Sequence, residues 1–292
     1  MKKPISEIIG DIFIYFVMLM VVIITLWPFI YVLSMSFSDP IHIMKRDVWL
    51  FPKGFSVATY GRILSTASIW RSYGNTIIVT GAGTLLNVIV TMMAGYVLSR
   101  KECFFKKHAM IMLVITMFFG GGLIPTFLVV KSLGLYNTRW ALILPLLTST
   151  WNIIITRVYI QSNIPDSLIE SAKIDGYNDM SIFYKIIVPL SAPIVAVITL
   201  FAAVSYWNDF FSALIYLPDK TKQPISLFLR RILLQANAED VLEEMEGMAE
   251  AIYYANQIKY SVIIITIVPI VCIYPFLQKY FTKGIMVGSL KG

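Results

Sequence analysis

Long stretches without a charged side chain recur along this chain, and they constrain its fold more than any other feature of the sequence. A helix of about 20 mostly apolar residues crosses the hydrocarbon core of a bilayer. Because an unpaired backbone amide is costly in lipid, long apolar stretches favour helices there. The stretches, the fourth of which runs from Trp140 to Thr156, predict an all-α integral membrane protein with six spans, at 12–38, 72–99, 108–130, 138–160, 186–208 and 260–278.

The composition excludes a soluble globular protein. Charged residues make up 14% of the chain and hydrophobic residues 58%, whereas an average soluble domain has roughly 25% charged residues. Apolar residues are spread from end to end, so a single transmembrane domain over residues 1–292 is expected. The net charge of +7 does not indicate nucleic-acid binding, because the basic residues stand in short runs beside apolar stretches.

Basic residues in short loops indicate the orientation. They cluster after the second and the sixth predicted span, at Arg100, Lys101, Lys106, Lys107, Lys279, Lys283 and Lys291. By the positive-inside rule, both termini are expected in the cytoplasm, which makes 39–71 and 218–257 extracytoplasmic loops. The first of these loops also carries basic residues and argues against this orientation, but longer loops follow the rule less strictly.

The cytoplasmic segment between the fourth and fifth predicted spans, residues 163–189, has the signals of two short helices. Asn163 is suited to cap the first helix, and Gly176 to end it in the left-handed conformation. A second helix is expected to begin at Asn178 and to end before Pro189. Together the two helices predict an elbow exposed to the cytoplasm.

Within the elbow, Glu170-Ser171-Ala172 is followed by Gly176, then by Ile186 and by Val188-Pro189. This pattern resembles the cytoplasmic signature of ABC importer permeases: Glu-Ala-Ala, three residues, Gly, nine residues, Ile, one residue, Leu-Pro. Both spacings are kept, and serine for alanine and valine for leucine are small departures. Gly176 or Pro189 alone would be explained as well by an ordinary loop between two spans. The complete pattern is not.

The resemblance implies that the elbow docks in a cleft of a separate cytoplasmic ATPase and carries its closure to the spans, as in type I ABC importer permeases. It implies a polar anchor at Glu170, close-packing points at Ala172 and Gly176, and an apolar contact surface around Leu168. The implied coupling residues are Leu168, Glu170, Ser171, Ala172, Gly176, Ile186 and Pro189. No catalytic residue and no metal ligand is expected in this chain.

Segments outside the elbow are also similar to one narrower family, at Trp207-Asn208-Asp209-Phe210, Tyr216-Leu217-Pro218-Asp219 and Lys283-Gly284. The chain resembles the second permease subunit of maltose-type carbohydrate importers over nearly its whole length. The stretches 118–126 and 132–138 look like the branch that handles oligosaccharides from polysaccharides, some of them rich in uronic acids.

This resemblance implies a complex in a prokaryotic plasma membrane. Its other members are a second, different permease subunit, two ABC ATPase subunits and an extracytoplasmic solute-binding protein. The chain has no Gly-x-x-x-x-Gly-Lys-Ser/Thr loop, so ATP and Mg are expected in the ATPase subunits, with no cofactor bound by this chain.

Polar and aromatic residues of the predicted spans are candidates for a sugar path. They are Asn75, Asn87, Tyr96, Trp207 and Asn208, and packing between helices is the alternative for each. Acidic residues of the second outer loop are candidates for contact with the binding protein, or else a solvated charge run: Glu239, Asp240, Glu243 and Glu244. Gly120 to Gly122 and Pro125 predict a kink in the third span, which either lines a pathway or packs as a local irregularity.

Other functions remain open at this point. An ABC permease for an amino acid or phosphate shares the elbow, and a channel, an ion-coupled carrier or a membrane scaffold needs no ATPase. No predicted span carries Asp, Glu, Lys or Arg well inside its apolar core, which disfavours the ion-coupled carrier. Cys103 and Cys272 have neither the spacing nor the surroundings of a disulfide or a metal site.

Overall fold

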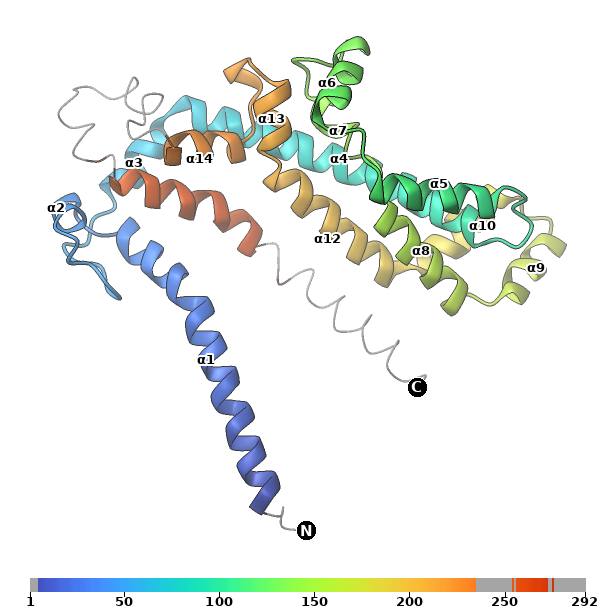
Figure 1. Cartoon of the computed structure of the whole chain (residues 1–292), viewed down its shortest axis with the longest axis horizontal. Helices are drawn as coiled ribbons and strands as arrows, with labels where there is room; N and C mark the ends of the chain where they lie inside the picture. Colours follow the sequence, from blue (N-terminus) through green and yellow to red (C-terminus); the bar gives the residue numbers. More distant parts are fainter. Residues whose placement is uncertain (1–4, 235–253, 255, 273–274, 276–292) are drawn as a thin grey trace. The chain divides into compact units, whose positions relative to one another are not determined.

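The computed structural model describes residues 5–234, 254, 256–272 and 275, and every regular element in that part of the chain is helical (Figure 1). The predicted all-α fold class is confirmed. In chain order the elements are α1 (Ile5–Ser36), α2 (Pro40–Met44), α3 (Ala58–Ser65), α4 (Ala67–Ser99), α5 (Lys106–Phe118), α6 (Leu123–Ser132), α7 (Trp140–Ile143), α8 (Thr150–Asn163), α9 (Asp166–Ile174), α10 (Asp179–Ile182), the π-helical η1 (Phe183–Ile187), α11 (Val188–Leu190), α12 (Ala192–Asn208), α13 (Phe211–Tyr216), the 3₁₀ turn η2 (Lys220–Lys222), α14 (Ile225–Leu234) and a helix at Asn256–Cys272.

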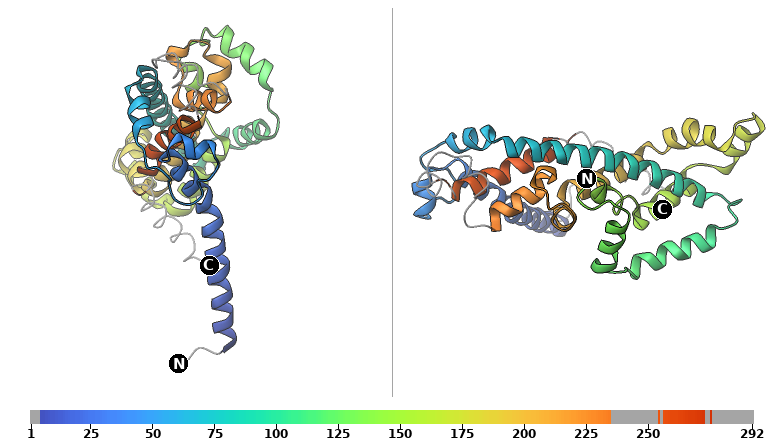
Figure 2. Two further views of the ribbon diagram at one scale, coloured as in Figure 1. Left: turned by 90° about the vertical axis from the view of Figure 1, so that its left-hand side faces the viewer. Right: turned by 90° about the horizontal axis from the view of Figure 1, so that it is seen from above.

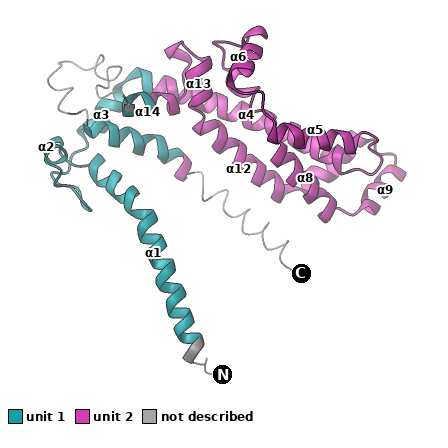
Figure 3. Ribbon diagram, in the orientation of Figure 1, with its two compact units in different colours: residues 1–69, 229–269 teal, residues 70–228, 270–292 magenta. Residues whose placement is uncertain are grey.

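The chain divides into two compact units (Figure 3). The first contains residues 1–69 and 229–269, and the second contains residues 70–228 and 270–292. A single domain over the whole chain therefore stays a prediction. All of the predicted coupling residues and all of the predicted substrate-path residues belong to the second unit.

Two helices in the described part of the chain, Glu7–Ser36 and Ala67–Ser99, are long and apolar enough to cross a bilayer singly. Two bent pairs pass the same test when each pair counts as one span: α5 with α6, bent by 116°, and Asp179–Leu190 with α12, bent by 84°. The predicted spans at 108–130 and 186–208 are therefore not straight helices. The sixth, at 260–278, corresponds to the apolar helix Asn256–Cys272 and extends into residues that the structure mostly leaves undescribed.

The sharp turn between α5 and α6 lies at the predicted glycine-rich kink (Figure 2). Gly122 has a φ of +82°, in the left-handed region that glycine adopts at little cost. Pro125 stands in the first turn of α6, where its missing N–H is not needed. The kink is confirmed, and its cause is local backbone chemistry.

Buried polar contacts hold the first unit together. The Gln257 side chain is fully buried, accepts a hydrogen bond from the Thr59 hydroxyl at 2.5 Å and donates one to the Ser36 carbonyl at 3.2 Å. The Asp39 carboxylate caps α2 by accepting from the Ile41 N–H. The buried side chains of Thr59 and Gln257 are thereby paired, as is usual for buried polar groups.

The second unit has two apolar cores. One is built on Val79, Leu142, Ala202, Tyr206 and their neighbours, from α4, α7, α12 and α13. The other joins α4, α8, α9, η1 and α12, through Met92, Tyr96, Ile160, Ile164, Ile169, Ala172, Ile182, Phe183, Ile187, Ile194 and Ile198. The elbow is therefore packed against the long helices of its own unit. Among these, α4 extends along the second unit as one long helix (Figure 2).

Candidate functional site

The first helix of the elbow begins later than the sequence predicts. The prediction that Asn163 caps this helix is wrong, because Asn163 is the last residue of α8 and its amide donates to the Tyr159 carbonyl at 2.9 Å. The residue before a proline is pushed out of the helical region, and Ile164, which precedes Pro165, is extended. The helix α9 begins only at Asp166.

Gly176 ends α9 with a φ of +81°. The Gly176 N–H donates to the Lys173 carbonyl at 3.1 Å, and the Tyr177 N–H donates to the Ala172 carbonyl at 3.0 Å. This pair of bonds is a Schellman motif, which satisfies the last carbonyls of a helix. A Cβ placed on Gly176 has no neighbour within 4 Å in the described part of the chain, so the demand for glycine is conformational there.

The second helix of the elbow begins where predicted. Asn178 caps α10 by accepting a hydrogen bond from the Ser181 N–H at 2.8 Å. The predicted end before Pro189 is wrong, because the helix continues through η1 and α11 and reaches Leu190. A π-helical segment precedes the proline, and Pro189 stands in the first turn of α11, where its missing N–H is tolerated.

The two faces of α9 differ in burial. Ile169 and Ala172 are 3% and 5% exposed and belong to the core of the second unit. Leu168, Glu170 and Ser171 are exposed, and Ile174 at the end of the helix is 86% exposed. The elbow thus has one face fixed to its own unit and another that is open.

Ion pairs join the elbow to the loop between α4 and α5. Asp166 lies 3.4 Å from Arg100 and 2.8 Å from Lys101, and Lys173 lies 3.3 Å from Glu102. These five residues are called the charged cluster below. A hydrogen bond and the charge of Lys101 lower the pKa of Asp166, so the carboxylate stays ionised at neutral pH. The cluster ties the first and the last turn of α9 to the end of α4.

The predicted fourth span, 138–160, is interrupted between α7 and α8. Pro145 lies in the interruption and supplies no N–H to a helix. The carbonyls of Leu146 and Leu147 instead accept hydrogen bonds from the Asn87 amide, at 3.1 and 2.9 Å. Irregular backbone at membrane depth is tolerated where it lines a cavity, and Leu146, Thr148 and Ser149 line one.

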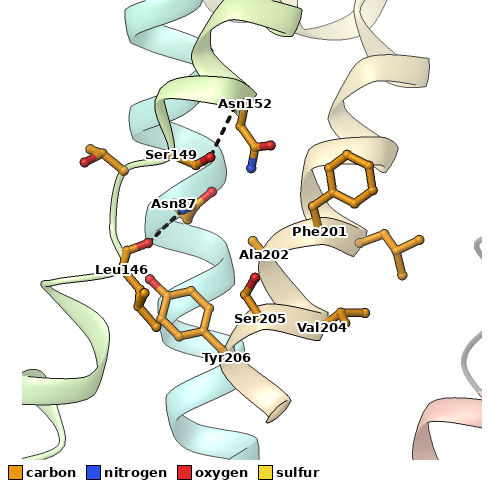
Figure 4. A pocket seen from close by; sticks show the side chains of 11 residues that line it. Asn87, Leu146, Ser149, Asn152, Phe201, Ala202, Val204, Ser205 and Tyr206 are labelled. Atoms are coloured by element: carbon orange, nitrogen blue, oxygen red, sulfur yellow. Dashed lines mark hydrogen bonds between the residues drawn. The ribbon is translucent and has the colours of Figure 1, made fainter. Parts of the chain in front are cut away.

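A cavity of about 700 Å³ lies beside this interruption (Figure 4). Its lining comes from α4, from the 144–149 segment, from the beginning of α8 and from α12. The lining residues are Asn87, Leu146, Thr148, Ser149, Asn152, Leu200, Phe201, Ala202, Val204, Ser205 and Tyr206. They combine apolar and aromatic groups with amides and hydroxyls, and none of them is charged.

Of the predicted substrate-path residues, only Asn87 lines this cavity. Asn75 is engaged elsewhere: its amide donates to the carbonyls of Thr221 and Gln223, at 2.8 and 3.1 Å. Its side-chain oxygen accepts from the Arg139 guanidinium at 2.8 Å. Asn75 thus joins the beginning of α4 to the loop before α14.

The other predicted path residues, Tyr96, Trp207 and Asn208, do not line this cavity. Tyr96 is buried in the core beneath the elbow, with its ring 5.7 Å from that of Phe183. Trp207 is buried, whereas Asn208 is exposed and its amide donates to the Val204 carbonyl at 3.0 Å. The structure therefore does not bring these residues together.

The cavity contains residues that the sequence did not single out, above all Asn152 and Tyr206. A signal for them is present, because Pro145 followed by Ser149 breaks a helix and starts a new one inside a predicted span. The predicted binding-protein contacts, Glu239, Asp240, Glu243 and Glu244, lie outside the described residues. Within the described residues no three His, Cys, Asp or Glu side chains are grouped as metal ligands.

This chain is similar to components of membrane transport systems. Residues 88–287 match the family model described as "Binding-protein-dependent transport system inner membrane component". The "Polygalacturonan/rhamnogalacturonan transport system permease protein YtcP" of Bacillus subtilis is 42% identical over 97% of this chain and 98% of its own length. "Protein LplC" of the same organism is 39% identical over 92% of this chain and 90% of its own.

A solved structure is similar as well. It is described as the crystal structure of a bacterial ABC transporter involved in the import of the acidic polysaccharide alginate. The TM-score is 0.86 at 30% identity, and the similarity covers 96% of this chain and 99% of that one.

Proposed function

This chain belongs to the family of binding-protein-dependent transport system inner membrane components, and we infer from this that it is the permease subunit of an ABC importer of oligosaccharides. The observation that carries the inference is the similarity to a polygalacturonan/rhamnogalacturonan permease along nearly the whole chain. The protein is a transport component and not an enzyme. Hydrolysis of ATP takes place in separate subunits.

The proposed complex contains a second permease subunit, two cytoplasmic ATPase subunits that bind ATP and Mg, and an extracytoplasmic solute-binding protein. This chain binds no cofactor and crosses the plasma membrane several times, with both termini in the cytoplasm. The basic loop after α4 and the exposed elbow support this orientation, because short basic loops stay in the cytoplasm.

In this proposal the open face of α9, with Leu168, Glu170 and Ile174, docks in the ATPase. The opposite face, with Ile169 and Ala172, is packed on the core that includes α8 and η1. Closure of the ATPases therefore pushes on an element that is already fixed to the long helices. The spans shift from an inward-facing to an outward-facing arrangement as the elbow moves with them.

The proposed substrate is a fragment of an acidic polysaccharide. Two similar proteins support this choice, one named for polygalacturonan and rhamnogalacturonan and the other described with alginate. The described residues of the cavity offer amides, hydroxyls and aromatic rings, which suit a sugar ring better than an apolar solute.

The test of this function is the ATPase activity of the complete complex in proteoliposomes. We expect hydrolysis to rise when the binding protein and an acidic oligosaccharide are added together, and to rise less with either alone. A monodisperse membrane protein that copurifies with no ATPase and transports a solute on an ion gradient would contradict the proposal.

The charged cluster leads to a separate prediction. Lys173→Glu places two carboxylates side by side at Glu102 and is expected to lower the sugar imported per ATP about twofold, since exposed ion pairs are weak. The charge swap Glu102→Lys with Lys173→Glu is expected to recover most of the loss. Paired uptake and ATPase measurements on the same proteoliposomes check this. A double variant no better than the single one shows that the pair does not position the elbow.

A further inference from the structure

The beginning of α8 lies beside the cavity. The helix has 14 residues, and Ser149 caps it by accepting from the Asn152 N–H at 3.4 Å. In the described part of the chain the N–H groups of Thr150 and Trp151 have no hydrogen-bond partner. The first N–H groups of a helix carry the positive end of its dipole. Thr148 and Ser149 line the cavity, so this positive end borders it.

The side chain of Asn152 adds a second, independent polar group. Asn152 is 6% exposed, and its carboxamide is aimed into the cavity between α8 and α12 (Figure 4). Among the described residues no group accepts from or donates to this carboxamide, and its polar atoms reach the open space of the cavity. The Asn152 carboxamide is therefore available to hydrogen-bond a group that enters the cavity from outside the chain.

The rest of the lining is neutral. Phe201 and Ala202 of α12 face Asn152 across the cavity, and the Tyr206 ring closes another side (Figure 4). The Tyr206 hydroxyl donates to the Ile143 carbonyl at 3.0 Å and is therefore occupied. No lining residue carries a negative charge to balance the positive end of α8. An anionic group that also accepts hydrogen bonds fits this arrangement best.

We propose that the cavity is a subsite for one uronic-acid residue of the transported oligosaccharide, with its carboxylate at the beginning of α8 and on the Asn152 amide. The inference rests on the proposed function and goes further, because it assigns substrate contact to this subunit and to named groups. The volume of about 700 Å³ is within the range of small-molecule sites. Interrupted helices with their N-terminal ends at anionic substrates are a known solution in membrane transport.

The test compares an acidic and a neutral ligand on the purified complex of both permeases and both ATPases, without the binding protein. The probes are a labelled galacturonate trisaccharide and its counterpart with every carboxylate reduced to an alcohol. Asn152→Asp places an anion against the carboxylate and is expected to weaken binding of the acidic trisaccharide about tenfold, while the neutral one changes less than about twofold. Asn152→Leu is expected to act in the same direction with a smaller effect.

Asn256→Asp is the matched control, because it adds the same charge at an exposed position outside the cavity. It is expected to leave the affinity for both probes unchanged. Equal weakening of both probes by Asn152→Asp, or of neither, overturns the subsite. Wild-type complex that imports the acidic trisaccharide but binds it no better than the neutral one overturns the subsite and leaves the proposed function intact. Wild-type complex that imports no oligosaccharide with its binding protein overturns both.

Discussion

Replacing Gly176 by valine is expected to lower oligosaccharide uptake about tenfold, with the complex still assembled in the membrane. Gly176 has a φ of +81°, and a left-handed residue with a Cβ costs roughly 1–2 kcal/mol, more for a β-branched one. The backbone can relieve this strain by leaving the left-handed conformation, but the hydrogen bonds from the Gly176 and Tyr177 N–H groups at the end of α9 are then lost. The angle between the two elbow helices then changes, and closure of the ATPases no longer moves the spans. Uptake, normalised to the amount of assembled complex, is the measurement.

Two controls separate coupling from stability. Gly176→Asn is expected to keep most of the uptake, since asparagine tolerates the left-handed region. Gly134 has a φ of +69° and open space around a built Cβ, as Gly176 has, but it lies outside the elbow. Gly134→Val should therefore carry similar strain without uncoupling ATP hydrolysis from uptake. Equal uptake by Gly176→Val and the wild type would contradict the coupling role.

The elbow shows which features of the structure could be predicted from the sequence: those that depend on single residues, and not those that depend on distant partners. The end of α9 at Gly176 and the cap of α10 at Asn178 follow from backbone preferences of single residues, and the structure has both. The partners of Asp166 and Lys173 are 66 and 71 residues away, at Arg100 and Glu102. From the sequence, the basic loop therefore indicates only the orientation of the chain, because no pattern in a single sequence pairs such distant charges.

The cavity was missed for a related reason. A stretch without charges reports that a segment is apolar and says nothing about whether its helix is continuous. The span predicted at 138–160 rests on the charge-free stretch 140–156, yet Pro145 lies in a break of its helix, and the Asn87 amide donates to the carbonyls of Leu146 and Leu147. Asn75 and Asn87 are both candidates for a sugar path in the sequence. Only the fold shows that Asn75 joins two segments and that Asn87 lines the cavity.

Gly83→Ala is expected to destabilise the second unit by about 1–3 kcal/mol, the usual cost of overpacking a core. A Cβ at Gly83 lies 2.6 Å from Cζ of Tyr206, too close for any real contact. The ring cannot simply move aside, because it is buried and its hydroxyl donates to the Ile143 carbonyl. Thermal unfolding of the purified complex measures the loss, and uptake should fall too, since Tyr206 lines the cavity.

Gly81 offers the matched comparison two residues earlier in α4, where a built Cβ has no neighbour within 4 Å. Alanine is favoured over glycine in a helix by about 0.8–1.0 kcal/mol, so Gly81→Ala is expected to be neutral or stabilising. The same substitution in the same helix is thus expected to have opposite signs at the two positions. Gly83→Ala with Tyr206→Leu should recover part of the stability, because the branched side chain does not extend as far as the ring. If both glycine variants unfold at the same temperature, the close approach of α4 and α12 at Tyr206 does not contribute to the fold.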